Sequence, residues 1–258
     1  MSKKTESYYD AWTKRYMASG YGDIIQAHRP ANVHDLLDYT AEQAGIKDGM
    51  TILDAGCGVC GPAIYFAEKY DITIHALSIS GEQIRIAKER ISKAGPENKI
   101  IPQKGDFHEL DKLYPAEHFD LILLLESYGH ASNHKKLIHS AEKVLKTNGK
   151  IYIKDYFKKE ITGSKTRMKA VKKAIKRMNK YYAYNLPDLN NTLTYLRQTD
   201  LSLQYIQRHQ LPLDNEKSVG QFETDYGIDL YDGGFHYIFL EPLELLFQKP
   251  ASRDEPIT

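Results

Sequence analysis

Closely spaced glycines after an apolar segment are the first residues whose spacing points to ligand chemistry. The stretch reads Leu53-Asp54-Ala55-Gly56-Cys57-Gly58-Val59-Cys60-Gly61. Glycines between a strand and a helix permit a tight turn and let the backbone approach a ligand closely. A dinucleotide-binding loop is one alternative. Asp54 argues against it, because a carboxylate there repels a pyrophosphate and suits a positively charged amino group. Ser78 also replaces the acid that nicotinamide-binding proteins carry after the second strand.

A carboxylate and an imidazole form the second candidate for chemistry. Glu126 and His130 lie just after the most apolar run of the chain, residues 119–125. Either side chain can take a proton from a reacting group, so both are candidate general bases. In the alternative interpretation, Glu126 binds loop amides or orients a ligand, and His130 caps a helix or supports another side chain.

Cys57 and Cys60 have the Cys-x-x-Cys spacing of redox and zinc sites. They are the two cysteines of the chain, and no second pair of ligands accompanies them. We therefore predict no metal site, and a reducing compartment is the natural expectation.

Alternating strands and helices must position these residues. Apolar runs at 50–54, 71–79, 99–103, 119–125 and 150–155 predict five strands with helices between them. This alternation is typical of a parallel sheet covered on both faces, which binds ligands at the carboxyl ends of its strands. Segments near 201–213 and 235–248 predict further strands. The predicted fold class is α/β: a doubly wound, Rossmann-like mixed sheet of five parallel strands plus a C-terminal antiparallel strand, with a helical cap.

Charge and composition limit the functional class. The 258 residues carry 35 Lys and Arg against 34 Asp and Glu, a formal net charge of +1. This balance argues against a surface that binds nucleic acid throughout. We expect no signal peptide, since the first residues lack an apolar stretch, and no membrane span, since no apolar run is long enough. We expect a cytoplasmic protein that acts on a small molecule, and a homo-oligomer is one of the states that the sequence leaves open.

Four pieces in order make residues 50–155 resemble the class I S-adenosylmethionine-dependent methyltransferases. The pieces are Leu53–Gly58 with Gly61, Ser78-Ile79-Ser80 with Gln83, Gly105-Asp106-Phe107, and Phe119-Asp120. The resemblance implies S-adenosylmethionine as the cofactor and S-adenosylhomocysteine as the product. It also implies regions: an N-terminal lid segment 1–30, a cofactor-binding core 31–155, a helical cap 156–200, C-terminal strands 201–250 and a tail 251–258.

The same resemblance implies contacts to the methionine part of the cofactor. The backbone of Gly56, Cys57 and Gly58 would pack against this part. Asp54 would act on its amino group, directly or through an ordered water. Glu126 would face the surroundings of the methyl group.

For the ribose and adenine, the sequence departs from the common family pattern. Most members end the second strand with an acid that holds the ribose hydroxyls, whereas Ser78, Ile79 and Gln83 occupy this region here. Ser78 and Gln83 would contact the ribose. Asp106 would accept a hydrogen bond from the adenine amino group, and the Phe107 backbone would contact the ring. Alternatively, Asp106 only caps a turn.

The methyl acceptor is predicted from a closer resemblance. The Ser78–Gln83 segment is similar to that of cyclopropane synthases and of sterol, tocopherol and prenyl-diphosphate C-methyltransferases. The Glu126–His130 segment resembles those of cyclopropane synthases and of sterol and phosphoethanolamine methyltransferases. We therefore favour C-methylation of an isoprenoid or other alkene, in secondary metabolism, with Glu126 or His130 as base.

Methyl attack on an alkene leaves a carbocation, and aromatic faces stabilise cations. The segments that usually form the lid in this family hold Tyr9, Tyr181, Tyr182 and Tyr184, with Tyr8 beside them. These tyrosines are candidates for an aromatic wall around the cation. Packing of the cap is the alternative interpretation.

A basic segment separates the core from the C-terminal strands. Between Lys158 and Lys180 there are ten Lys and Arg and one acid, Glu160. A solvated face, an anion site for a diphosphate or phospholipid substrate, and a face that binds RNA or a membrane all fit this composition.

Other functions remain open beside C-methylation. They are an O- or N-methyltransferase of a small metabolite, an RNA-binding methyltransferase that uses 158–180, and a module that binds the cofactor without transferring methyl. A diphosphate substrate would bring Mg²⁺ with it.

Overall fold

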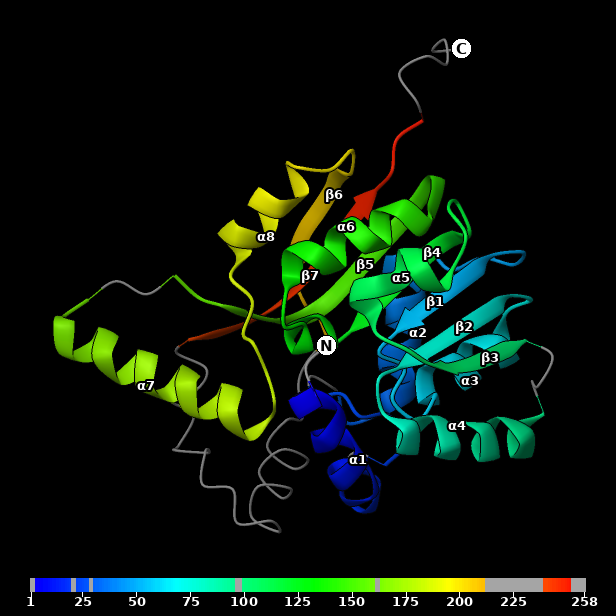
Figure 1. The fold of residues 1–258 in the computed structure, drawn as a ribbon, viewed down its shortest axis with the longest axis horizontal. Helices are drawn as coiled ribbons and strands as arrows, with labels where there is room; N and C mark the ends of the chain where they lie inside the picture. The colour runs from blue at the N-terminus through cyan, green and yellow to red at the C-terminus, as the bar shows by residue number, and fades with distance from the viewer. Residues whose placement is uncertain are drawn as a thin grey trace.

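The computed structural model describes residues 3–19, 22–27, 30–95, 99–160, 163–211 and 239–251. The strands are β1 (Thr51–Ala55), β2 (Thr73–Ser78), β3 (Ile100–Lys104), β4 (Phe119–Leu125), β5 (Leu145–Lys158), β6 (Ser202–Arg208) and β7 (Leu240–Gln248). They form one sheet in the order β3-β2-β1-β4-β5-β7-β6 (Figure 1). Residues 212–238 and 252–258 lie outside the described parts, and with them most of the predicted tail.

The direction of the strands confirms the predicted fold class. Strands β1 to β5 run parallel, β7 runs antiparallel to β5, and β6 runs antiparallel to β7. Strand β1 pairs with β2 on one side and with β4 on the other. The order of the strands therefore reverses at β1, and ligands of such sheets bind at the carboxyl ends beside this point.

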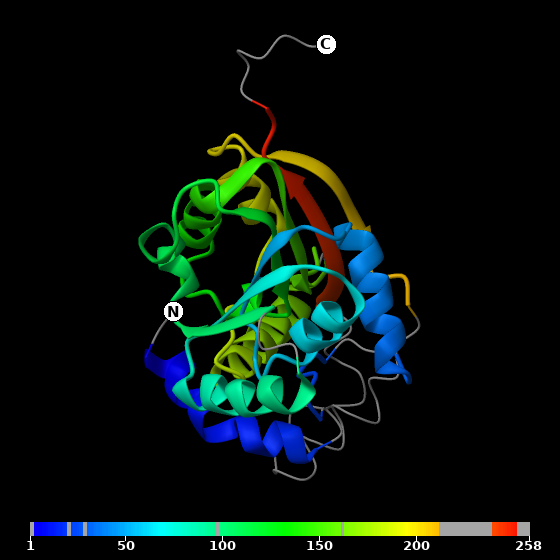
Figure 2. The same cartoon turned by 90° about the vertical axis from the view of Figure 1, so that its right-hand side faces the viewer.

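Helices cover both faces of the sheet (Figure 2). They are α1 (Lys3–Ala18), α2 (Val33–Ala44), α3 (Gly61–Lys69), α4 (Gly81–Ala94), α5 (Leu110–Leu113), α6 (His134–Val144), α7 (Lys165–Tyr181) and α8 (Leu189–Leu196), with short 3₁₀ turns η1 (Phe107–Glu109) and η2 (Tyr128–His130). One core joins α2, α3 and α4 to the sheet, and a second core joins α5, α6 and α8 to the opposite face. Burial of these two apolar faces holds the helices on the sheet, and the helices in turn hold the loops at the ends of the strands.

Local sequence signals set the helix starts at this edge. Pro62 occupies the first turn of α3, where its missing N–H costs no hydrogen bond. Ser80 caps α4, because its Oγ accepts from the amide of Gln83 at 3.1 Å. Asn133 caps α6 in the same way, from the amide of Lys136 at 2.9 Å. The loops before these helices are thereby held in place, and with them the candidate residues.

Two predicted boundaries differ from the structure. Helix α6 ends at Val144 and β5 begins at Leu145, before the start of the strand predicted at 150–155. The reason is Leu145, which is fully buried and pairs with Phe119 of β4. At its other end β5 continues to Lys158, because β7 pairs with it along residues 150–158.

The residues of the predicted cap, 156–200, lie in three different elements of the structure. Its first residues belong to β5, and α7 projects from the sheet (Figure 1). Helix α8 lies against α6, buries Leu196 in the second core and also buries Thr192. The range predicted as a cap is therefore divided between the end of β5, α7 and α8.

Helix α1 lies across the carboxyl edge of β2 and β3. Asp10 accepts from Ser80 Oγ at 2.5 Å, and Lys104 forms an ion pair with Glu6 at 2.7 Å. Lys14 forms another with Glu82 of α4 at 3.1 Å. These contacts hold the N-terminal helix beside the candidate site. Among the helices in the described parts, none has both the length and the apolar content needed to cross a membrane.

Candidate active site

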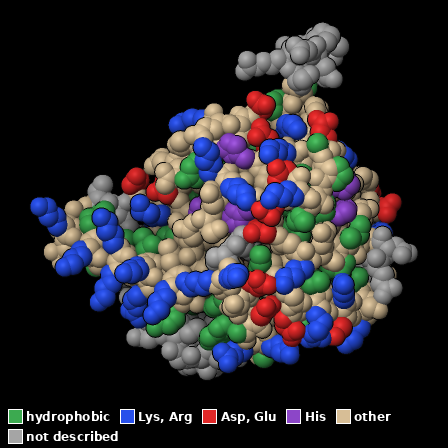
Figure 3. All heavy atoms as spheres, viewed as in Figure 1, with side chains coloured by type: hydrophobic (Ala, Val, Ile, Leu, Met, Phe, Trp, Pro, Cys, Tyr) green, Lys and Arg blue, Asp and Glu red, His purple; other side chains and the backbone are tan. Residues whose placement is uncertain are grey.

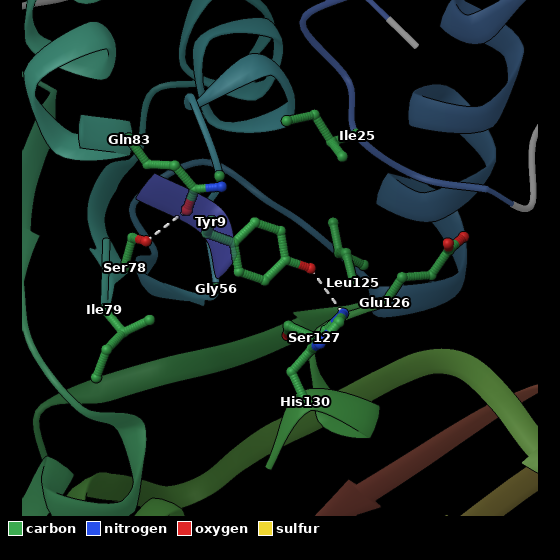
Figure 4. Close-up of a pocket in the computed structure, with 11 residues that line it drawn as sticks. Tyr9, Ile25, Gly56, Ser78, Ile79, Gln83, Leu125, Glu126, Ser127 and His130 are labelled. Carbon is green, nitrogen blue, oxygen red and sulfur yellow. Dashed lines mark hydrogen bonds between the residues drawn. The ribbon is translucent and has the colours of Figure 1, made fainter. Parts of the chain in front are cut away.

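A pocket opens at the carboxyl ends of β1, β2 and β4, next to the strand reversal and under α1 (Figure 4). Its empty volume is about 440 Å³, part of which is open to solvent. The lining residues are Tyr9, Ile25, Gly56, Gly58, Ser78, Ile79, Gln83, Leu125, Glu126, Ser127 and His130. The structure thus brings together both candidate bases, most of the predicted cofactor residues and one predicted tyrosine.

The glycine loop leaves space where a ligand must approach. Gly56 has φ +106°, and a Cβ there would overlap the side chain of Ser127. Gly58 has φ +55°, and a Cβ there would meet nothing within 4 Å. A larger residue at Gly58 would therefore extend into open space beside the pocket. Both positions require the positive φ that glycine adopts without strain.

Asp54 lies at the base of this loop and is 3% exposed. Within the described residues, no group donates a hydrogen bond to its carboxyl oxygens. Burial raises the pKa of Asp54 to about 7. A buried carboxyl group without a donor is costly, and a cationic amino group beside it offsets this cost. The residues present therefore fit the amino group of a bound methionine moiety, although Asp54 does not itself line the pocket.

The β2–α4 junction presents a polar edge to the pocket. Ser78 Oγ donates to Gln83 Oε1 at 2.6 Å and accepts from the amide of Ser80 at 3.1 Å. This pair orients Gln83, whose amide group projects toward the pocket in Figure 4. Ile79 adds an apolar wall. A polar amide beside an apolar surface fits a ribose and the base attached to it.

Asp106 and Phe107 do not line the pocket. The carboxylate of Asp106 accepts from the amide and Nδ1 of His108 at 2.9 and 2.7 Å, and it caps η1. Burial opposes its charge, but the hydrogen bonds from His108 outweigh this and hold the pKa of Asp106 below its usual range. The Phe107 side chain is packed in the core. Contacts of both residues with adenine stay a prediction.

Glu126 follows β4 with φ +53°, a conformation that side chains seldom adopt. Its Oε1 accepts from Nζ of Lys154 at 2.7 Å, and its Oε2 accepts from the amide of Ala27 at 2.6 Å. The Lys154 side chain is 2% exposed and the Glu126 side chain 9%. Lys154 also donates to Gln26 at 2.9 Å. Glu126 is therefore a paired carboxylate that joins β4, β5 and the segment 22–27.

His130 lies on η2 with both ring nitrogens engaged. Nε2 is 2.7 Å from the hydroxyl of Tyr9, and Nδ1 is 3.2 Å from the carbonyl oxygen of Ala183. Because a carbonyl only accepts, Nδ1 carries the proton and Nε2 accepts from Tyr9. Burial lowers the pKa of His130 to about 4, while the nearby charge of Glu126 acts in the opposite direction. The imidazole is therefore neutral at physiological pH.

A buried carboxyl group behind η2 holds this turn. Asp155 lies in β5. Its Oδ2 accepts from the amide of Gly129 at 2.8 Å, and its Oδ1 accepts from the amide of Tyr156 at 2.7 Å. The hydroxyl of Tyr184 also donates to Oδ1 of Asp155, the oxygen that accepts from the amide of Tyr156. Burial raises the pKa of Asp155 to about 7. A Cβ at Gly129 would overlap the ring of Tyr184, so only glycine fits between them.

The predicted tyrosines lie in three environments. Tyr9 lines the pocket, and the partly buried ring of Tyr184 packs edge-on against His130 at 4.8 Å between centroids. Tyr182 packs in an aromatic cluster with Tyr8 and Tyr9 of α1. Tyr181 is 44% exposed and is not among the residues that line the pocket.

Cys57 and Cys60 are both buried and carry free thiols. The hydrogen bond to Cys60 and burial raise the pKa of Cys57 well above its usual value. In the described part of the chain, no cluster of three or more His, Cys, Asp and Glu side chains could hold a metal ion.

Sequence reasoning missed Lys154 and Asp155 as site residues. A signal was present, since two adjacent charged residues close a predicted central strand at the edge where ligands bind. It also missed Ser127, Ile25 and Leu125. These residues line the pocket because of how distant segments pack together, which the local sequence does not indicate.

Comparison with known sequences gives the family. Residues 46–215 match the sequence family described as a methyltransferase domain. The chain is 31% identical to ajmaline N-methyltransferase of Rauvolfia serpentina over 159 residues, which is 60% of this chain and 54% of that protein. It is 38% identical to a sterol 24-C-methyltransferase of Gibberella zeae over 111 residues, which is 43% of this chain and 29% of that protein. The matches thus span about half of these relatives or less.

A solved structure shows the same fold over nearly the whole chain. The crystal structure of the [4+2]-cyclase SpnF has a TM-score of 0.77 at 18% identity and covers 97% of each chain. The sheet order, the glycine loop at the strand reversal and the match over residues 46–215 agree with one another. The chain therefore belongs to the methyltransferase domain family, within the class I S-adenosylmethionine-dependent methyltransferases.

Proposed function

We propose that the protein transfers a methyl group from S-adenosylmethionine to a nitrogen or oxygen atom of a small molecule, with Tyr9 and His130 as the proton acceptor. The observation that carries this proposal is the 2.7 Å contact between the Tyr9 hydroxyl and Nε2 of a neutral His130 in the pocket wall. Because a neutral imidazole can take a proton at Nε2, the pair can accept a proton from the acceptor through the phenol.

We assign the binding of the cofactor to the β1–α3 loop and the β2–α4 junction. Asp54 would hold the amino group, and the backbone of Gly56 and Gly58 would lie against the methionine part. Ser78 would orient Gln83 for the ribose, as their 2.6 Å hydrogen bond supports. The bound cofactor supplies a sulfonium methyl group that a nucleophile displaces in line, so the protein contributes mainly positioning and local charge.

The remaining residues position the base in this proposal. Asp155 fixes η2 through Gly129, and Ala183 fixes the tautomer of His130. The Glu126 charge faces the site and would stabilise a proton that arrives on His130. Glu126 itself is not the base, because Lys154 and the amide of Ala27 occupy its two oxygens.

We also propose that α1 acts as a lid. It delivers Tyr9 to the pocket and is held over it by ion pairs of Glu6 and Lys14 with β3 and α4. Product release would then require α1 to move. This role of the N-terminal segment rests on its position and on polar contacts at the surface, which are weak individually.

C-methylation of an isoprenoid or other alkene is the second candidate. The similarity to a sterol 24-C-methyltransferase favours it, as do the aromatic rings of Tyr9 and Tyr184 packed around His130. Against it, Lys154 and the amide of Ala27 hold both oxygens of the Glu126 carboxylate in the pocket wall, so this carboxylate is poorly placed to take the proton that a carbocation must lose. The fold alone does not decide, since the similar solved structure is described as a cyclase.

The test is methyl transfer from radiolabelled S-adenosylmethionine to a panel of amines, phenols, phosphobases, sterols and prenyl diphosphates, the last with and without Mg²⁺. We expect an N- or O-methylated product. With that acceptor, His130→Gln should lower kcat by about 10²–10⁴-fold, and Tyr9→Phe should lower it by a smaller factor. A C-methylated product would support the second candidate, and unchanged kcat in both variants would contradict the assigned base.

A further inference from the structure

Helix α7 carries a continuous cationic face. Its 17 residues contain six lysines and two arginines and no acid. At 3.6 residues per turn, the six lysines fall within a sector of about 100° around the helix axis. All six side chains are exposed: Lys165, Lys169, Lys172, Lys173, Lys176 and Lys180.

The opposite face of α7 is docked on the protein. Val171 is buried, and Ala174, Ile175 and Met178 pack with it against Leu186, Phe239 and Leu240. This packing fixes the rotation of the helix, so that the lysines point outward together. Figure 1 shows α7 projecting from the sheet, and Figure 3 shows the basic side chains gathered over it.

The lysines of α7 have no acidic partners in the described parts of the chain. Several basic residues elsewhere on the surface do have partners: Arg85 pairs with Glu82 and Glu89, and Lys112 and Lys136 pair with Glu109. Among the described residues, the face therefore carries charge that no acidic side chain neutralises, although the whole chain carries a net charge of only +1. Repulsion among these like charges destabilises the folded protein, and binding of an anionic partner would offset this cost.

We propose that the lysine face of α7 binds the anionic lipid surface of a membrane. A straight helix of this length presents its charges along about 25 Å in one line, which suits a flat surface of anionic headgroups. Lysine acts as a point charge toward phosphates, whereas nucleic-acid recognition relies more on planar arginine groups and stacked aromatic rings. Tyr181 is exposed at the end of the face, where an aromatic ring with a polar tip suits a membrane interface.

The attachment would bring the pocket to the membrane. Directly after α7, the chain reaches Ala183, whose carbonyl accepts from His130, and Tyr184, which binds Asp155. An acceptor dissolved in the lipid would then enter from the side of the pocket formed by these residues. The membrane proposal does not depend on the proposed chemistry, because the charged face lies outside the pocket.

The test is co-sedimentation of the full chain with vesicles of phosphatidylcholine that contain about 30% phosphatidylserine, compared with pure phosphatidylcholine. The variant Lys169→Gln/Lys173→Gln/Lys176→Gln removes three charges from the face. The matched control Lys88→Gln/Lys93→Gln/Lys135→Gln removes three exposed lysines from α4 and α6. We expect the α7 variant to lose at least about tenfold in partitioning to the anionic vesicles, and the control to change by less than about twofold.

Salt and competing ligands separate the alternatives. Binding should weaken steeply as ionic strength rises, since exposed charges are screened. Equal loss in the α7 variant and the control would overturn the proposal, as would equal binding to neutral vesicles. Release by millimolar inorganic phosphate at constant ionic strength would also contradict it and indicate a site for a free phosphate group. RNA binding lost in the α7 variant, without binding to vesicles, would assign the face to nucleic acid instead.

Discussion

Glu126 and Lys154 form a buried ion pair, with Oε1 and Nζ 2.7 Å apart, between the loop after β4 and strand β5. Glu126 was a candidate base, but because of this pair its carboxylate is held in place as a charge in the wall of the pocket. Since Oε2 of Glu126 also accepts from the amide of Ala27, the carboxylate ties the segment before α2 to the sheet.

Removal of Lys154 should destabilise the protein strongly. In Lys154→Met the Glu126 carboxylate stays buried without its partner, and we expect unfolding to become easier by about 3–5 kcal/mol. Urea denaturation measures this. The double variant Glu126→Gln/Lys154→Met should recover much of the loss, because no unpaired charge remains. If the single and double variants are equally unstable, the ion pair does not hold the loop.

Asp54→Asn should make the protein more stable at high pH and weaken cofactor binding, so the two effects have opposite signs. Burial raises the pKa of Asp54 from its usual value of 3.8 to about 7, so the folded state binds the proton more tightly than the unfolded state does. The stability that this group contributes is present at low pH and is lost as pH rises from about 4 through about 7. Above pH 7 the variant should therefore be more stable than the original protein, by on the order of 2–4 kcal/mol.

The same substitution should weaken binding of S-adenosylhomocysteine by about tenfold or more, since a charge-assisted contact to the amino group is lost. Thermal unfolding at pH 8 and calorimetry measure the two effects. A variant that binds the ligand as tightly as the original protein would show that Asp54 does not hold the amino group.

Gly129→Ala tests the packing behind the proposed base. A Cβ at this position overlaps the ring of Tyr184, so we expect a lower melting temperature and a loss of methyl transfer. Adding Tyr184→Ala should relieve the overlap and restore part of the stability. Gly81→Ala is the control, because its Cβ would meet only the side chain of Lys104, at ordinary contact distances of 3.8 and 3.9 Å. Normal stability of Gly129→Ala would mean that η2 and Tyr184 are not packed as described.

His130 should remain neutral well below the usual titration range of histidine. Burial lowers its pKa to about 4, and unfolded histidine titrates near 6.5. The unfolded state therefore takes up the proton first, and the stability that neutral His130 contributes is lost as pH falls from about 6.5 through about 4. Nitrogen chemical shifts of labelled histidine, assigned through His130→Gln, should stay those of the Nδ1–H tautomer down to pH 5. A midpoint near 6.5 would contradict the buried contact with Tyr9.

The fold and the glycine loop could be predicted because their signals are local. Gly56 and Gly58 mark a turn between a strand and a helix, and the apolar runs mark the strands by themselves. The contact of Tyr9 with His130 joins residues 121 positions apart, and that of Tyr184 with Asp155 joins β5 to the segment after α7. Such contacts depend on where α1 and α7 dock, which periodicity does not specify. Lys154 was missed for the same reason, because its partner emerges only from the register of β4 and β5.

Calorimetric titration with S-adenosylhomocysteine tests the central claim most directly. We expect binding in the original protein, with affinity at least about tenfold weaker in Gly58→Val, whose side chain would extend into the open space beside the pocket. Gly81→Ala should bind as the original protein does. If the original protein takes up no S-adenosylhomocysteine, or if Gly58→Val binds it with unchanged affinity, the pocket is not the cofactor site.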